Sequence, residues 1–313
     1  MTNNSTFPYL ADSRLGPSRI ELTADEYETL LSADATLQDA RDFEHRYDMV
    51  LSEYREFELG LTRASLNQQM GFLPNSYVEA MDLVTLGNRL LLNLMTVVRA
   101  HVDHTLSSFK TIDLAPGVAE RFKTLTNAAY DKHFEYRFME ALRNHSQHRE
   151  LPVHGVIAGG SLEEGVHWAE TLALVTRKAD LIVAGKFKAS VIEEMPARVN
   201  LRTMARVYVQ ALSEVHLALR EAVKEYVRVS REQIQSALDR FMNLYGMRRR
   251  VTAYDPTGSQ PPLELHLGWD DARVVLVARY SQPFMLAKYR SPLDQVVEQF
   301  VGFAEPNEGA ASM

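Results

Sequence analysis

The chain has 313 residues, no cysteine and a formal net charge of −7 at pH 7, with 46% hydrophobic and 24% charged residues. This length is enough to bury a large core in one large domain or two smaller ones. The lack of cysteine excludes disulfides, thiolate metal sites and cysteine nucleophiles. The acidic balance argues against a protein that coats nucleic acid nonspecifically, although it leaves room for a local basic site.

Residues 1–34 are expected to form a lead-in, irregular over its first twenty residues, where Pro8 and Pro17 interrupt regular structure. The first residues lack the basic-then-apolar order of a signal peptide. No apolar run approaches the roughly 18 residues that span a bilayer. We therefore expect a cytoplasmic protein with no membrane partner.

A heptad pattern over residues 37–61 predicts a long helix that packs on other helices. Its apolar positions are Ala40, Phe43, Tyr47, Val50, Tyr54, Phe57 and Leu61. A second helix is predicted from a capping box at Ser76 and Glu79 to about Leu106, apolar on much of its circumference. A third helix is predicted from Phe122 to just before Pro152, because the residue preceding a proline disfavours helical geometry.

The hydrophobic period changes after the third helix. Residues 152–176 are predicted to form an inserted β-hairpin around a Gly-Gly-Ser turn at residues 159–161. A fourth long helix is predicted from the N-cap Asn200 to Tyr245, with Gly246 as its C-terminal stop. A helical bundle with a hairpin insertion is therefore expected over residues 35–246.

The composition shifts again after Gly246, where residues 248–250 and 254–262 resemble a linker. Residues 251–304 are predicted to form a small α+β segment, with strands at residues 263–267 and 274–278 and a short helix that begins at Ser291 and Pro292. Residues 305–313 are expected to be disordered. The predicted fold class is mainly α: a long-helix bundle with an inserted β-hairpin and a small C-terminal α+β segment.

Arg143, Asn144 and His148 lie on the last turns of the third predicted helix, in the order Arg-Asn-x-x-x-His. RNA can be cleaved by its own 2′-hydroxyl, which needs groups that transfer protons and a cation that stabilises the transition state. Histidine suits proton transfer because its pKa is about 6.5, and the planar fork of arginine binds two phosphate oxygens. Asn144 shares a helix face with His148 and can hold a phosphate oxygen or orient the imidazole. His145 is a further candidate helper.

This order of residues resembles the motif of the HEPN superfamily, whose ribonucleases carry Arg, about four to six residues and then His at the end of a bundle helix. Arg143, Asn144 and His148 match that pattern, and the likeness covers at most residues 35–246. The resemblance implies a homodimer in which two motifs face each other and form one endoribonuclease site that uses neither metal nor cofactor. It also implies a role in toxin–antitoxin systems or antiphage defence, with an antitoxin or regulatory protein as a further partner.

A non-catalytic interpretation of the same residues stays open. Arg143 would then pair with Glu140 or Asp131, and His148 would interact with the last carbonyls of its helix. The protein would in that case be a helical interaction or regulatory protein on a HEPN-like scaffold.

The spacing from Arg to His recurs elsewhere, so it is not specific by itself. It is found again from Arg99 to His104 and from Arg149 to His154. His101 and His104 are three residues apart, but no third metal ligand stands near them, and the chain has no HExxH motif or EF-hand loop. We therefore expect no metal site.

Overall fold

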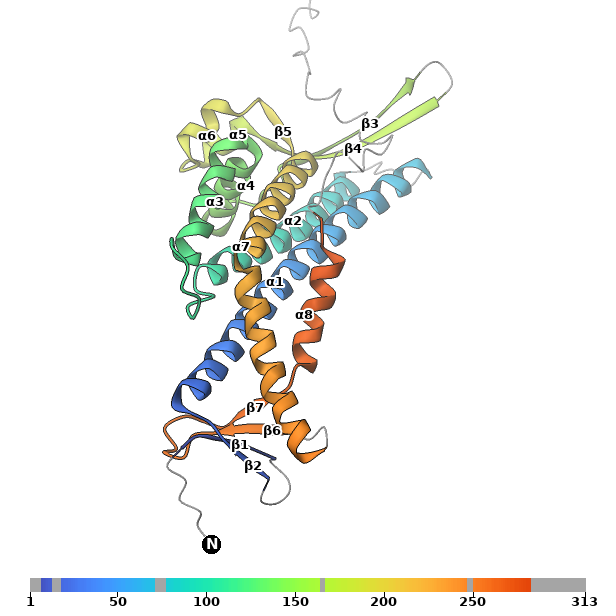
Figure 1. Ribbon diagram of the computed structural model, residues 1–313. Coiled ribbons are helices and arrows are strands. Elements are labelled where there is room, and N and C mark those ends of the chain that lie inside the picture. Colours follow the sequence, from blue (N-terminus) through green and yellow to red (C-terminus); the bar gives the residue numbers. More distant parts are fainter. Residues whose placement is uncertain (1–6, 13–17, 71–76, 164–166, 247–249, 283–313) are drawn as a thin grey trace, which may run out of the picture. The chain divides into compact units, whose positions relative to one another are not determined.

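The structure is a computed structural model and describes residues 7–12, 18–70, 77–163, 167–246 and 250–282 (Figure 1). The chain divides into two compact units, which are described separately. Unit 1 contains residues 1–49, 100–126 and 215–283, and unit 2 contains residues 50–99, 127–214 and 284–313. Helices dominate the described residues, which confirms the mainly α class with small β segments.

The long helices lie close to their predicted positions. The helices are α1 (Ala24–Gln69), α2 (Tyr77–Thr105), α3 (Val118–Lys132), α4 (Phe134–His148), α5 (Lys178–Ala184), α6 (Ala189–Glu194), α7 (Leu201–Tyr245) and α8 (Gly268–Arg279). All seven apolar positions of the predicted α1 seam are at most 7% exposed, which confirms the seam. Gly246 follows α7 with a φ of 74°, the left-handed conformation that ends many helices.

Unit 1 contains a four-stranded antiparallel sheet that joins the two ends of the described chain. Its order is β2-β1-β6-β7, with bounds Tyr9–Asp12 for β1, Arg19–Glu21 for β2, Val251–Tyr254 for β6 and Leu263–Leu265 for β7. The expected irregular lead-in is therefore wrong, because β1 pairs with β6 and buries Leu10 completely. No local sequence pattern predicted β1, because the strand has only four residues and pairs with β6, which is distant in the sequence.

The strand predicted at residues 274–278 is also wrong, because those residues lie in α8. The preference of valine for strands depends on packing of its side chain against neighbours on a pleated sheet surface. Here Asp270 and Asp271 stand in the first helical turn, where carboxylates are favourable. Asp270 is fully buried and binds Arg231 of α7 and Arg273. The strand predicted at residues 263–267 is confirmed over its first three residues as β7.

The helix expected from Phe122 to just before Pro152 is two helices, α3 and α4, divided at His133. His133 has an extended backbone, with φ −114° and ψ 118°. The Arg137 guanidinium donates hydrogen bonds to the carbonyls of Tyr130 and Asp131 at 2.8 and 2.9 Å. It thereby satisfies carbonyls that the end of α3 leaves free. The apolar spacing continues across the break, so the sequence pattern did not show it.

The inserted hairpin is confirmed, but its turn was misplaced. Strand β3 (Gly155–Glu163) pairs with β4 (His167–Arg177) along its whole length, and β4 pairs with the short β5 (Arg198–Asn200). Residues 159–161, expected in the turn, lie inside β3. The connection is at residues 164–166, outside the described residues, as are Ser76 of the predicted capping box and the helix predicted at Ser291.

Helix α2 is long and apolar enough to cross a membrane by length and composition alone. The core helix of a globular protein passes the same test, and 39% of its apolar window is buried. Leu91, Leu94, Met95 and Val98 are buried, which agrees with the predicted bundle helix. One such helix is weak evidence for a membrane span.

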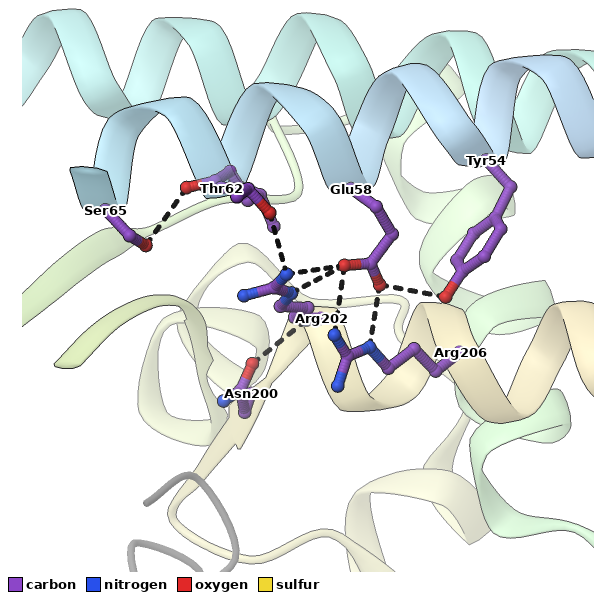
Figure 2. A network of polar contacts seen from close by, with 8 residues as sticks. Tyr54, Glu58, Thr62, Ser65, Asn200, Arg202 and Arg206 are labelled. Carbon is purple, nitrogen blue, oxygen red and sulfur yellow. Dashed lines mark hydrogen bonds and ion pairs between the residues drawn. The ribbon is translucent and has the colours of Figure 1, made fainter. Parts of the chain in front are cut away.

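A shared carboxylate joins α1 to α7 in unit 2 (Figure 2). Glu58 accepts hydrogen bonds from Arg202 Nε at 2.8 Å, from Arg206 Nε at 2.7 Å and from the Tyr54 hydroxyl at 2.8 Å. Burial alone would raise the pKa of Glu58, but the hydrogen bonds and charges of Arg206 and Arg202 outweigh it and lower the pKa. The carboxylate therefore stabilises the fold above its unfolded pKa, and this stabilisation is lost as the pH falls through the folded pKa.

We expect Glu58→Ala to lower the free energy of unfolding by about 3–5 kcal/mol at neutral pH, because it leaves two partly buried guanidinium groups without their carboxylate. Chemical denaturation followed by circular dichroism measures the change. Glu56→Ala, at an exposed position on the same helix, should cost no more than about 0.5 kcal/mol. Equal losses in the two variants would contradict the assigned role of Glu58.

Candidate functional site

Helix α4 positions the predicted site by burying one of its faces. Phe138, Met139 and Leu142 are fully buried. The last turns present four polar side chains on the remaining surface: Arg143, Asn144, Gln147 and His148, which we name the α4 strip. Asn144, Gln147 and His148 are exposed, whereas the Arg143 side chain is mostly buried, with 11% of its surface exposed.

Arg143 lies along the strip and does not form a close ion pair. Its Nη1 donates to Gln147 Oε1 at 3.2 Å and its Nη2 donates to Asn144 Oδ1 at 2.5 Å. Its Nε is buried without a hydrogen-bond partner among the described residues, and lies 4.0 Å from Glu140 Oε2. Two neutral amide oxygens therefore hold the fork of this guanidinium.

Glu140 is engaged by a tyrosine of α7. The hydroxyl of Tyr208 donates a hydrogen bond to Glu140 Oε1, and Tyr208 is fully buried. Burial raises the pKa of Tyr208 well above its usual value, and the adjacent carboxylate raises it further. The donor is therefore a neutral phenol, which hydrogen-bonds to the Glu140 carboxylate beside Arg143. The predicted Glu140 pair thus exists only as a long contact, which leaves the non-catalytic interpretation partly supported.

The structure brings Arg143 and Asn144 into contact, and among the described residues His148 makes no hydrogen bond with either. At about 100° per residue, Arg143 and His148 are roughly 140° apart around the helix, whereas Asn144 and His148 are only about 40° apart. The guanidinium bends toward Asn144, and so toward the side of the helix where His148 stands. In the part of the chain that the structure describes, no hydrogen bond or ion pair engages the His148 imidazole.

The candidate helper His145 faces the core and does not join the strip. It is 4% exposed, its ring lies 5.5 Å from that of Phe187, and both ring nitrogens lack a hydrogen-bond partner among the described residues. Burial lowers its pKa. A substrate at the strip would not touch this imidazole, so we assign it a packing role.

The segment after α4 is fixed by its own contacts. His154 Nδ1 accepts a hydrogen bond from the Arg177 backbone at 3.3 Å and lies 3.2 Å from Asp180. The repeated spacing from Arg149 to His154 therefore ends on a structural histidine. Two other basic residues near this sheet are also engaged: Arg177 pairs with Asp180, and Lys178 donates to the carbonyl of Met195.

Gln147 and Tyr208 were missed by sequence analysis. Gln147 is four residues from Arg143, and this spacing could have identified it as a partner on the same helical face. Tyr208 is distant in sequence and lies on another helix, so no local pattern could connect it with Glu140.

Unit 1 contains a second polar cluster that the sequence did not suggest. Glu44 accepts from Arg220 Nε at 2.7 Å and lies 3.2 Å from His216 Nε2. The fully buried His216 ring is stacked between Phe43 and Tyr47, with ring centres 4.0 and 3.8 Å apart. Burial lowers the pKa of His216 to about 4, although Glu44 opposes the shift.

His101 lies next to this cluster, 5.3 Å from His216 between ring centres. It is fully buried, and both its nitrogens lack hydrogen-bond partners in the described chain. Burial lowers its pKa well below the usual value, and the neighbouring His216 and Arg46 add to the shift. No group of three or more potential ligands for a metal ion occurs among the residues that the structure describes.

The chain matches no protein-family model, no curated protein and no solved structure.

We expect His145→Leu to leave the free energy of unfolding unchanged or to raise it by up to about 1 kcal/mol. The substitution removes two buried nitrogens without partners and keeps the apolar packing. Urea denaturation measures the effect. A loss well above 1 kcal/mol would show that the imidazole makes a polar contact that stabilises the fold.

We also expect the stability of the protein to fall as the pH is lowered below about 6.5. The unfolded chain takes up protons on His101 and His216 there, whereas the folded chain keeps both neutral to a lower pH, so acid favours unfolding. His101→Leu should reduce the slope by up to about 1.4 kcal/mol per pH unit. His104→Leu, at an exposed position on the same helix, should keep the slope, and equal slopes in all three proteins would refute this account.

Proposed function

We propose that this protein is a metal-independent endoribonuclease that cleaves RNA through attack by the 2′-hydroxyl. The observation that carries the proposal is the α4 strip. It combines a guanidinium held by neutral amide oxygens with an exposed imidazole that no described residue engages. Phosphate oxygens are stronger acceptors than amide oxygens, so a phosphodiester can replace Asn144 or Gln147 at the Arg143 fork.

In the proposed reaction a histidine removes the proton of the 2′-hydroxyl, and the 2′-oxygen forms a bond to phosphorus. The bond from phosphorus to the 5′-oxygen then breaks, and that oxygen receives a proton from an imidazolium. The products are a 2′,3′-cyclic phosphate and a 5′-hydroxyl. Arg143 stabilises the charge on the phosphoryl oxygens, and Asn144 positions the phosphate.

One imidazole cannot act as base and acid on opposite sides of the phosphate in the same step. The proposal therefore includes a homodimer, in which His148 of one copy acts as the base and His148 of the other copy as the acid. The resemblance to HEPN ribonucleases supports this arrangement, and supports a role as a toxin or defence effector that an antitoxin or regulatory protein would control. Cytoplasmic location belongs to the same proposal.

The test incubates the full chain with labelled RNA in excess EDTA. We expect wild-type protein to produce 2′,3′-cyclic phosphate ends, and His148→Ala and Arg143→Ala to lower the rate by about 10²–10⁴-fold. Thermal unfolding of each variant separates loss of chemistry from loss of fold.

The matched control is His104→Ala, because His104 also stands five residues after an arginine and is exposed near a helix end. It should keep wild-type activity. Cleavage that persists unchanged in His148→Ala would remove the α4 strip from the reaction. If wild-type protein leaves RNA intact, the protein is better described as a non-catalytic interaction or regulatory protein on a helical bundle.

A further inference from the structure

The loop that joins α5 to α6 lies against the last turns of α4. Phe187 of this loop is buried, and its ring centre lies 6.0 Å from that of Phe138 and 5.5 Å from that of His145. Phe138 and His145 are seven residues apart, so they lie on nearly the same line along the helix. Helix α4 also contacts α6, and α4, α5 and α6 lie together in Figure 1. Phe187 thereby fixes the loop beside the end of α4.

The loop and the α4 strip lie on adjacent sides of this helix end. At about 100° per residue, His148 stands about 60° around the helix axis from His145, whose ring Phe187 contacts. Arg149 follows His148 directly, as the C-cap of α4. Lys186 is the exposed residue that precedes Phe187, so it is held near the same end of the helix.

Most basic side chains between residues 132 and 198 have a partner. Those engaged by a hydrogen bond or an ion pair are Lys132, Arg137, Arg143, Arg177, Lys178 and Lys188. Arg149, Lys186 and Arg198 are exposed, and in the described part of the chain no hydrogen bond or ion pair engages their side chains. Two of these three cations, Arg149 and Lys186, belong to the end of α4 and the loop beside it.

Lys186 has a backbone conformation that lysine rarely adopts. Its φ is 61°, and Gly185 before it has a φ of 69°. A β-carbon makes this left-handed region unfavourable, so glycine or asparagine usually occupies it. Strain of this kind is found most often at functional sites, where a requirement other than stability selects the residue. An exposed lysine at this position therefore indicates a role for its charge.

We propose that Lys186 and Arg149 bind a backbone phosphate of RNA next to the phosphate that Arg143 holds at the α4 strip. The inference rests on the proposed function, because that function supplies the RNA and places the cleaved phosphate at Arg143. Lysine binds phosphate as a flexible point charge and arginine as a planar fork. Cations without a protein partner can make these contacts without first breaking an ion pair. The substrate is then an RNA with at least one phosphate besides the one that is cleaved.

The experiment measures binding of a labelled 2′-O-methyl oligoribonucleotide to the full chain over a range of salt concentrations. This probe keeps its phosphates but has no 2′-hydroxyl, so it binds without being cleaved. Each phosphate contact with a single strand contributes about 0.7 to the slope of log K against log salt concentration. We expect Lys186→Gln/Arg149→Gln to weaken binding and to lower the magnitude of the slope by about 1.4, because both contacts are lost.

The matched control is Arg63→Gln/Arg89→Gln, which removes the same charge from exposed positions on α1 and α2. Neither arginine is engaged by a hydrogen bond or ion pair among the described residues, and the variant should keep the wild-type slope. Lys186→Gly separates charge from fold. Glycine adopts a positive φ without steric cost, so the unfolding temperature should stay the same or rise while binding weakens.

Cleavage of unmodified RNA, measured in parallel, tests the proposed function separately. If the probe binds with the expected slopes but wild-type protein leaves RNA intact, the cleavage reaction is refuted and the phosphate site stands. Equal slopes in wild type, the Lys186/Arg149 variant and the control would overturn the phosphate site even if RNA is cleaved. Wild-type protein that does not bind the probe would overturn it as well.

Discussion

In both units, α1 is joined to α7 by one carboxylate of α1 that contacts two side chains of α7. Glu58 binds Arg202 and Arg206 in unit 2, and Glu44 binds Arg220 beside His216 in unit 1. In each case the two side chains of α7 are four residues apart and lie on one face of the helix. The two contacts are two heptads apart on both helices. A helix that slipped along its partner would leave these charges partly buried and unpaired, which costs far more than a slipped apolar contact.

The geometry of the α4 strip depends on this contact in unit 2. Tyr208 follows Arg206 by two residues on α7, and its hydroxyl engages Glu140 of α4. Glu140 Oε2 lies 4.0 Å from Arg143 Nε. The Nη atoms of Arg143 donate hydrogen bonds to the amide oxygens of Asn144 and Gln147. Tyr208 of α7 and Arg143 of α4 thus lie on the same carboxylate, Tyr208 through a hydrogen bond and Arg143 through a long contact.

The strip is connected to β3 by a short segment that hydrogen-bonds to the rest of unit 2 at several points. Asn88 of α2 accepts a hydrogen bond from the Val153 backbone at 2.9 Å, and Thr176 of β4 donates to the carbonyl of Pro152 at 2.5 Å. The His154 backbone donates to Val175 at 2.9 Å. The segment between His148 and Gly155 is therefore fixed to α2 and β4.

The sequence by itself determined the long helices α1, α2 and α7, the hairpin and the polar end of α4, because a heptad seam, a change of period and a helix stop are local signals. It did not determine the break at His133, the helix at Asp270 or the pairing of β1 with β6. These depend on Arg137, on Arg231 and on a strand at the far end of the chain, and no local pattern records such partners. The residues of the candidate site were visible in the sequence as a spacing. Only the tertiary structure decided that Arg143 and Asn144 lie in contact, that His145 is buried and that His148 is exposed, because these outcomes follow from which face of α4 the rest of unit 2 covers.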